Sequence, residues 1–177
     1  PAYPVKPIRL VVPFPPGGTA DIQGRLLADK LAPRLRQQIV IDNRGGAQGS
    51  IGLEIVARSP ADGYTIAVST VGSWVVNPHL YKLPYDVLND FAPIIHVAST
   101  PGLLSVHPSL PVRTVKELIA LARQRPRELT YGSSGVGGFD HMSGELFDSM
   151  AKTRMTHVPY KGSAPAILDA VGGHISL

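Results

Sequence analysis

Cysteine is absent from the 177 residues of this chain. Disulfide bonds, thiolate metal sites and a cysteine nucleophile are therefore excluded, while a reducing and an oxidising compartment both remain compatible with the sequence. No apolar run approaches the roughly 20 residues that span a bilayer, so direct membrane insertion is not expected. The basic residues are scattered and the formal net charge is only +4, so no nucleic-acid partner is expected. With 44% hydrophobic and 17% charged residues, the composition is that of a globular protein.

The motifs of common cofactor and metal sites are also missing. The Gly132–Gly138 loop has no Lys-Ser/Thr pair, which a P-loop needs in order to reach phosphates and magnesium. It is not a dinucleotide fingerprint either, because Asp140 stands where the third glycine of G-x-G-x-x-G belongs. The six histidines are dispersed and form no H-E-x-x-H motif. We therefore expect no cofactor and no metal.

Glycine-rich loops between a strand and a helix are what the sequence does contain. Three loops share this pattern: Pro15–Thr19, Gly132–Gly138 and Lys161–Ser163. A helix that opens directly after such a loop leaves backbone N–H groups without a partner inside the helix, and these groups suit an anion. The repetition predicts a protein that holds a small acidic molecule.

The order of hydrophobic segments predicts an α/β fold. The expected strands are Ile8–Phe14, Ile39–Ile41, Tyr64–Ser69, Pro93–Ser99, Leu103–Val106, Leu129–Tyr131, Met155–Tyr160 and Ile175–Leu177. Helices are expected between the first three strands, and this β-α-β-α-β order implies a parallel sheet covered by helices. Thr19 is expected to cap the first helix, with Asp21 in its first turn. Thr114 and Glu117 have the spacing of a capping box, and their helix is expected to stop before Pro126.

A serine nucleophile is an alternative function that the same loop raises. Ser133 or Ser134, with His141 or His157 as base, would make a dyad of a hydrolase or transferase. The loop is only half of a nucleophile elbow, because G-x-S-x-G requires glycine where Val136 stands. Closeness along the chain is also no evidence of catalytic geometry.

The ordered motifs resemble the Bug-type extracytoplasmic solute receptors of tripartite tricarboxylate transporters. They are, in chain order, Tyr3-Pro4-x-Lys6-Pro7-Ile8, Val12-Pro13-Phe14-x-Pro16-Gly17-Gly18-x-x-Asp21, Asn43-Arg44, Asp62-Gly63-Tyr64, Asn77-Pro78-x-Leu80-Tyr81, Tyr85-Asp86-x-x-x-Asp90-Phe91-x-Pro93, Tyr131-Gly132-Ser133-Ser134-Gly135, His141 with Gly144-Glu145-Leu146-Phe147, and His157-Val158-Pro159-Tyr160-Lys161-Gly162. Ala20 and Ala47-Gln48 stand where members of this family often carry other small or polar residues.

The resemblance implies a two-lobed fold similar to type II periplasmic binding proteins, which close on a ligand like a hinge. It places the first α/β lobe at residues 1–100 and the second at residues 101–177, with the chain stopping inside the second lobe. It also implies a ligand site without catalytic residues or metal. The expected ligand-binding residues are Phe14, Gly17, Gly18, Thr19, Asp21, Ser69, Ser133, Ser134, Gly135, His141, Tyr160 and Lys161.

The function implied by the resemblance is capture of a mono-, di- or tricarboxylate and its delivery to membrane transporter subunits, without enzymatic activity. Ordered waters between protein and ligand would let one scaffold accept several acids. A periplasmic location, after removal of a signal peptide, is the corresponding expectation. Besides the hydrolase, a ligand-sensing regulatory domain is a further alternative. Trp74 and Tyr160 either line the pocket or belong to the core, and Lys161 either pairs with a carboxylate or is solvated.

Overall fold

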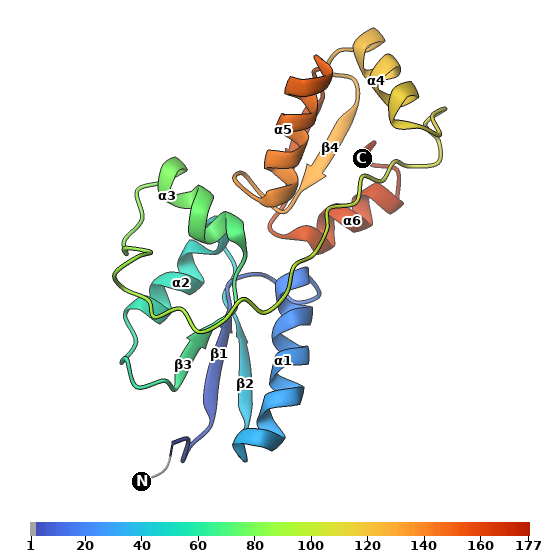
Figure 1. The fold of residues 1–177 in the computed structure, drawn as a ribbon. Coiled ribbons are helices and arrows are strands. Elements are labelled where there is room, and N and C mark those ends of the chain that lie inside the picture. The colour runs from blue at the N-terminus through green and yellow to red at the C-terminus, as the bar shows by residue number, and fades with distance from the viewer. Residues whose placement is uncertain (1–2) are drawn as a thin grey trace. The chain divides into compact units, whose positions relative to one another are not determined.

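A computed structural model describes residues 3–177, and its chain divides into two units, Pro1–Ser99 and Thr100–Leu177 (Figure 1). Each unit is a parallel sheet with helices against it. The α/β class predicted from the sequence is therefore confirmed.

The first unit contains a three-stranded parallel sheet. Its strands are β1 (Ile8–Val12), β2 (Ile39–Asn43) and β3 (Thr65–Ala67), in the order β2-β1-β3. Ile8 lies opposite Ile39 in one ladder, and Arg9 lies opposite Thr65 in the other. Because β1 is the central strand, its run of branched side chains is almost wholly buried.

Two crossover connections cover this sheet. They contain α1 (Thr19–Leu35) between β1 and β2, and the short turn η1 (Ala47–Gly49) with α2 (Ser50–Ala57) between β2 and β3. The first connection runs from the central strand to one edge, and the second runs back across it to the other edge, so right-handed crossovers place α1 and α2 on opposite faces. Both helices approach closely through glycine: a Cβ on Gly24 would lie 3.1 Å from Val12, and one on Gly52 would lie 2.6 Å from Pro13. After β3 the chain enters η2 (Gly72–Val76) and α3 (Asn77–Leu80).

This topology makes a switch point at the carboxyl end of the sheet. The chain leaves β1 toward α1, and it leaves the neighbouring strand β3 toward η2. In open parallel sheets, ligands bind where neighbouring strands send their connections to opposite sides. The loops after β1 and β3 are therefore the part of this unit that the fold offers to a ligand.

The second unit pairs β4 (Thr130–Ser133) with β5 (Thr156–Pro159) in parallel. Its helices are α4 (Val115–Gln124), α5 (Phe139–Ala151) and α6 (Ser163–Val171). A Cβ on Gly144 of α5 would meet the ring of Tyr131, whereas a Cβ on the next strand residue, Gly132, would lie 3.3 Å from Ala166 of α6. Since successive strand residues point to opposite faces, α5 and α6 cover opposite faces of β4. The capping box of Thr114 and Glu117 forms as predicted.

Three predicted strands are not strands in the structure. Residues 93–99 and 103–106 have no regular secondary structure, and Ile94 and Leu103 are 78% and 89% exposed. Their branched side chains predicted strands, but a strand needs a ladder partner, and these segments have none among residues 3–177. Ile175–Leu177 is also not assigned as a strand, although Leu177 bonds to β4 through its N–H to Thr130 and through its carbonyl to Gly132.

The expected cap of α1 is wrong as well. Gly18, not Thr19, is the N-cap residue, and no side chain at this position accepts a hydrogen bond from the first turn of the helix. Thr19 is already the first helical residue. The Asp21 carboxylate reaches back and accepts the N–H of Gly17, which precedes the N-cap, so this bond fastens the loop to α1 and does not cap the helix.

Candidate ligand-binding loops

The Phe14–Thr19 loop of the first unit is organised around one buried carboxylate. Asp21 is 2% exposed and accepts hydrogen bonds from the Gly17 N–H at 2.9 Å, the Asn43 amide at 2.9 Å and Arg25 Nε at 3.0 Å. Asn43 also donates to the carbonyl of Phe14 at 3.0 Å. The end of β2 therefore fixes the loop that follows β1.

These contacts keep Asp21 ionised. The hydrogen bond from Arg25 is the main cause that lowers the pKa of Asp21 to about 2, against the opposing effect of burial. The guanidinium of Arg25 also offsets the negative charge that Asp21 places beside the start of α1. An anion at this loop would consequently meet backbone dipoles and not a bare carboxylate.

A left-handed turn lies next to this loop. Gly46, Ala47, Gln48 and Gly49 all have φ between 45° and 127°. Two buried side chains hold the turn: Ser73 Oγ donates to the Gln48 carbonyl at 2.9 Å, and Asn77 Nδ2 donates to the same oxygen at 3.0 Å. Non-glycine residues in this backbone region are strained, and such strain gathers at functional sites.

Within the described chain, Ser69 and Asn77 each place a buried polar atom without a partner at this edge, the Ser69 hydroxyl and the Asn77 Oδ1, and Ser69 lies nearer the end of the sheet. Its hydroxyl oxygen is buried and has no hydrogen-bond partner among residues 3–177. It lies two residues after the end of β3, and the neighbouring strand β1 ends two residues before Phe14. A buried polar atom without a partner costs free energy, so its presence at the switch point calls for a functional explanation.

In the second unit, the Ser133–Gly138 loop is fastened by Asp140 of α5. Its carboxylate accepts the N–H of Ser134 at 2.6 Å and the Ser134 hydroxyl at 2.9 Å. The loop also bonds to the segment after β5, because Tyr160 donates its N–H to the Ser133 carbonyl and Gly162 donates its N–H to that of Ser134. The structure thus brings together two of the predicted glycine-rich loops within this unit.

A cluster of two imidazoles and a tyrosine lies beneath this loop. His157 stacks on His141 with ring centroids 4.1 Å apart, and on Tyr131 at 5.0 Å. Burial lowers the pKa of His157, and the neighbouring His141 lowers it further. Burial, together with the hydrogen bond to Glu145 at 2.7 Å, raises the pKa of the Tyr131 hydroxyl. Two members of the cluster are therefore held in their neutral forms: His157 resists a positive charge, and Tyr131 resists a negative one.

The cluster contains the serine–histidine contact that a nucleophile would need. Ser133 Oγ lies 2.5 Å from His157 Nε2. However, Ser133 is 0% exposed, and Ser134 already donates its hydroxyl to Asp140. A substrate carbonyl has no access to the buried hydroxyl, so this contact is better explained as a structural one.

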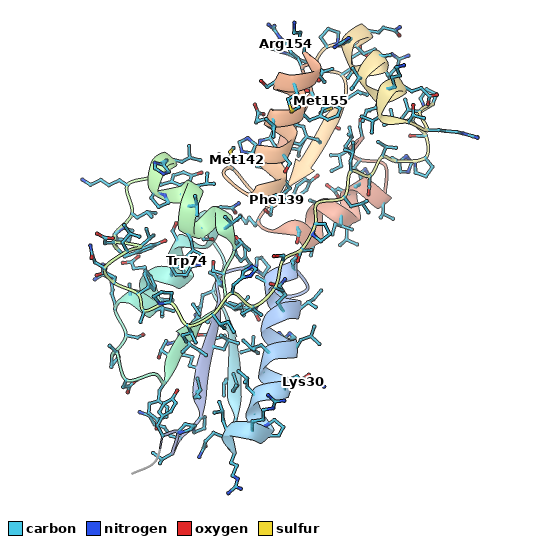
Figure 2. All side chains as sticks on the ribbon, viewed as in Figure 1. Lys30, Trp74, Phe139, Met142, Arg154 and Met155 are labelled. Carbon is cyan, nitrogen blue, oxygen red and sulfur yellow. The ribbon has the colours of Figure 1, made fainter. Side chains whose placement is uncertain are left out.

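The remaining predicted residues divide between the core and the surface. The Tyr160 hydroxyl donates to Asp169 of α6 at 2.6 Å, while Lys161 is exposed. Trp74 (labelled in Figure 2) is partly buried and packs edge-on against Phe91 with ring centroids 4.8 Å apart. Gly17 and Thr19 are exposed on the first loop, whereas Phe14 and Gly18 are buried.

Sequence reasoning missed the residues that fasten the loops. Arg25, Ser73 and Asp140 were not expected at the site, and Asn43 and Asn77 were noted only within motifs. One signal was available: Gly17-Gly18 and Gly137-Gly138 each precede a helix with an aspartate in its first turn. In each case the aspartate of the first turn bonds back to the preceding loop, Asp21 to Gly17 and Asp140 to Ser134.

Neither a membrane-spanning helix nor a metal-binding cluster occurs within residues 3–177. Across residues 3–177, no helix has the length and apolarity needed to traverse a bilayer. In the same range, no three acidic or histidine side chains gather in a way that would hold a metal ion.

The fold and the loops define a class: an α/β protein of the kind seen in periplasmic binding proteins. A solved structure described as R. palustris Rpa4515 with adipate superposes with a TM-score of 0.94 at 46% identity, covering 99% of this chain and 59% of that one. MatC (Rpa3494) from Rhodopseudomonas palustris, with bound malate, superposes with a TM-score of 0.86 at 28% identity, covering 98% of this chain and 60% of that one.

Sequence comparison gives the family. Residues 24–177 match the family described as the tripartite tricarboxylate transporter family receptor, TctC. This chain belongs to that family, whose members are extracytoplasmic solute receptors. It is 39% identical to protein BugT of Bordetella pertussis over 176 residues, covering 98% of this chain and 54% of BugT. The chain thus spans about half the length of the curated relatives it matches.

Proposed function

We propose that this protein is a receptor that binds a small organic acid and delivers it to a tripartite transporter outside the cytoplasm, in the periplasm. The two relatives described with bound adipate and malate support a dicarboxylate as the ligand. A signal peptide removed on export belongs to the same proposal.

The observation that carries the proposal is the Ser69 hydroxyl at the switch point of the first sheet, which finds no hydrogen-bond partner within residues 3–177. A ligand carboxylate supplies the acceptor that this hydroxyl lacks. The neighbouring Phe14–Thr19 loop leads into the N-terminus of α1, whose backbone dipoles favour negative charge. Binding would thus depend on dipoles and a hydroxyl, with Arg25 already committed to Asp21.

In the second unit, we assign the ligand-facing role to Ser134, Gly135 and His141, which are partly exposed around the loop. Ser133 has the supporting role, because it is fully buried. Lys161 is exposed on the adjoining loop and is a candidate partner for a second carboxylate.

Isothermal titration and thermal unfolding with succinate, malate, adipate and citrate test this proposal. A ligand should raise the melting temperature with its concentration, as mass action requires. The uncharged diamide of adipic acid is the matched ligand control and should have no effect. If no acid stabilises the chain at millimolar concentration, and a fluorophosphonate probe labels Ser133 or Ser134, the hydrolase alternative replaces the receptor.

The variant Gly18→Val tests the first loop. Gly18 has φ −81° and ψ 169°, a conformation that valine adopts readily, so the fold should persist. The added side chain should block backbone contacts to the ligand and abolish the thermal shift. Ala61→Val is the control, because Ala61 is exposed in the turn that precedes β3, at the opposite edge of the sheet. Undiminished binding by Gly18→Val would remove this loop from the site.

A further inference from the structure

The imidazole pair in the second unit fastens the Ser133–Gly138 loop by two separate contacts. His141 Nδ1 accepts the backbone N–H of Gly137 at 3.1 Å. His157 Nε2 lies 2.5 Å from Ser133 Oγ, and that oxygen in turn accepts the N–H of Gly135 at 3.1 Å. The two rings therefore hold both ends of the loop, one through a backbone amide and the other through a serine.

The contact with Gly137 fixes the protonation state of His141. A backbone N–H can only donate, so Nδ1 must carry a lone pair, and the neutral ring has its proton on Nε2. Adding a proton to Nδ1 would place two N–H groups opposite each other and break this hydrogen bond. The carboxylate of Glu145, 3.9 Å from His141 Nε2, lies where it can face the resulting positive charge.

The second ring makes a doubly charged pair costly. With ring centroids 4.1 Å apart, two imidazolium ions would repel each other by about 4 kcal/mol at the effective dielectric constant of a protein surface. The other groups that face His157 are Tyr131 and Ser133 from β4, and Asp140, His141 and Glu145 from α5. Asp140 and Glu145 favour its charged form, whereas burial and His141 oppose it, and burial is the largest of these effects.

We propose that His157 is a positioning residue for Ser133, and that His141 fastens the Ser133–Gly138 loop at Gly137 while its Nδ1 is unprotonated and releases this amide on protonation. The contact between His157 and Ser133 outlasts protonation, because Ser133 Oγ also donates to the Gly135 carbonyl at 3.3 Å and can accept an N–H from Nε2. The loop is then ordered at neutral pH and loosened in acid. The fastening itself stands apart from the proposed function. Its consequence, weaker acid binding at low pH, rests on that function.

Amide hydrogen exchange measured by NMR on the ligand-free chain, from pH 7.5 to pH 5.0, tests the release. The Gly137 amide should lose about tenfold in protection factor, which corresponds to the loss of one hydrogen bond of ordinary strength. The Gly17 amide is the matched internal control, because it is also followed by glycine and donates to the Asp21 carboxylate. Its protection should stay constant over this range. A pH-independent Gly137, or an equal loss at Gly17, would overturn the proposal.

Two substitutions distinguish an effect of histidine protonation from a purely structural role of the two side chains in holding the loop. His141→Asn keeps an acceptor oxygen near the place of Nδ1, and His157→Gln keeps a polar atom near the place of Nε2, but neither side chain titrates. The double variant should protect Gly137 at pH 7.5 and lose the pH dependence. His79→Gln, at an exposed histidine of the first unit, should retain it. Persistence of the acid-induced loss in the double variant would assign the release to other groups.

Adipate binding measured at both pH values distinguishes the proton-dependent fastening of the loop from the proposed function. If adipate binds the native chain at pH 7.5, its dissociation constant should rise about tenfold by pH 5.0. Because His141 is also assigned to the ligand, the double variant is expected to bind more weakly at both pH values, and the quantity compared is the ratio of its two dissociation constants, which should be close to one. If adipate does not bind at all while Gly137 still shows its pH profile, the proposed function fails and the proton-dependent fastening stands. If adipate binds equally at both pH values while Gly137 loses protection, the loop has no part in binding, and the proposed consequence is overturned.

Discussion

The Phe14–Thr19 loop of the first unit and the Ser133–Gly138 loop of the second both follow a parallel strand and lead through Gly-Gly into a helix. In both, an aspartate of the first helical turn bonds back to the loop. The first loop is fastened further by Arg25 and Asn43, whereas the second is fastened by Ser133 and two stacked imidazoles.

The two loops differ in the pH range over which the side chains that fasten them change charge. The pKa of Asp21 is about 2 and arginine keeps its proton, so the first loop keeps its contacts throughout the pH range in which histidine titrates. The second loop depends at Gly137 on an unprotonated Nδ1 of His141, which stacks on His157, whose pKa is lowered by burial. The same strand–loop–helix geometry is therefore compatible with a fixed loop and, on our proposal, with one that responds to protons.

The largest expected effect comes from removing the buried carboxylate of the first loop. Asp21→Ala leaves the Gly17 N–H and the Asn43 amide without their acceptor, and it leaves Arg25 without its ion pair. We expect the free energy of unfolding to fall by about 3 kcal/mol, since lost hydrogen bonds to a charged group are costly to leave unreplaced. Equilibrium unfolding in urea measures the change.

Asp29→Ala is the control for this prediction. Asp29 is exposed on the same helix, so its removal should change the free energy of unfolding by less than about 0.5 kcal/mol. Equal losses in the two variants would mean that helix charge, and not the fastening of the loop, is what Asp21 contributes.

Removing the corresponding aspartate of the second unit should cost less. Asp140→Ala breaks two hydrogen bonds to Ser134, but the position is partly exposed and water can replace them. We expect a loss of about 1 to 2 kcal/mol in the free energy of unfolding. Glu128→Ala, at an exposed acidic residue of the same unit, should be nearly neutral. A loss as large as that of Asp21→Ala would show that the two loops do not differ in this respect.

The alternation of strands and helices was predictable because it depends on local patterns. Branched residues at β1 and the Thr114–Glu117 spacing each predict their element without knowledge of distant contacts. The false strand at residues 103–106 has the same local pattern, but a strand also needs a partner that the local sequence does not name.

The positions of the loops could be predicted from the sequence, but the hydrogen bonds that hold them could not. Glycine and proline mark where a chain turns, so both glycine-rich loops were expected. Asn43 reaches Asp21 from another strand, and His157 reaches Ser133 across 24 positions of sequence. Such contacts depend on strand register, which a single sequence does not determine.

The pH dependence of stability should belong to the second unit. Because the pKa of His157 is lowered in the folded chain, the unfolded chain binds more protons below the ordinary histidine value near 6.5. Stability is then complete above about pH 7 and falls as the pH drops below 6.5, by at most about 1.4 kcal/mol per pH unit for one group. Asp21 adds nothing to this slope, since the stabilisation from its lowered pKa is present above about pH 4 and is lost only as the pH falls toward 2.

Urea unfolding of the native chain and of His157→Gln at pH 7.5 and pH 5.5 measures this contribution. We expect the loss of unfolding free energy between the two pH values to be smaller in the variant than in the native chain, while His79→Gln leaves it unchanged. An undiminished difference would assign the slope to other histidines, and the contrast between the two loops would lose its electrostatic basis.

The smallest effect is expected at the neutral contacts of the first unit. Ser73→Ala removes one of two donors to the Gln48 carbonyl, and Asn77 still satisfies that oxygen. The loss in the free energy of unfolding should be about 0.5 to 1 kcal/mol and independent of pH.

Ser69→Ala is the matched comparison at a second serine of the same edge, because its hydroxyl has no partner among the described residues. Its removal should cost nothing in the ligand-free chain, yet it should weaken acid binding if a ligand carboxylate accepts that hydroxyl. A destabilising Ser69→Ala variant with undiminished binding would make Ser69 a structural residue like Ser73.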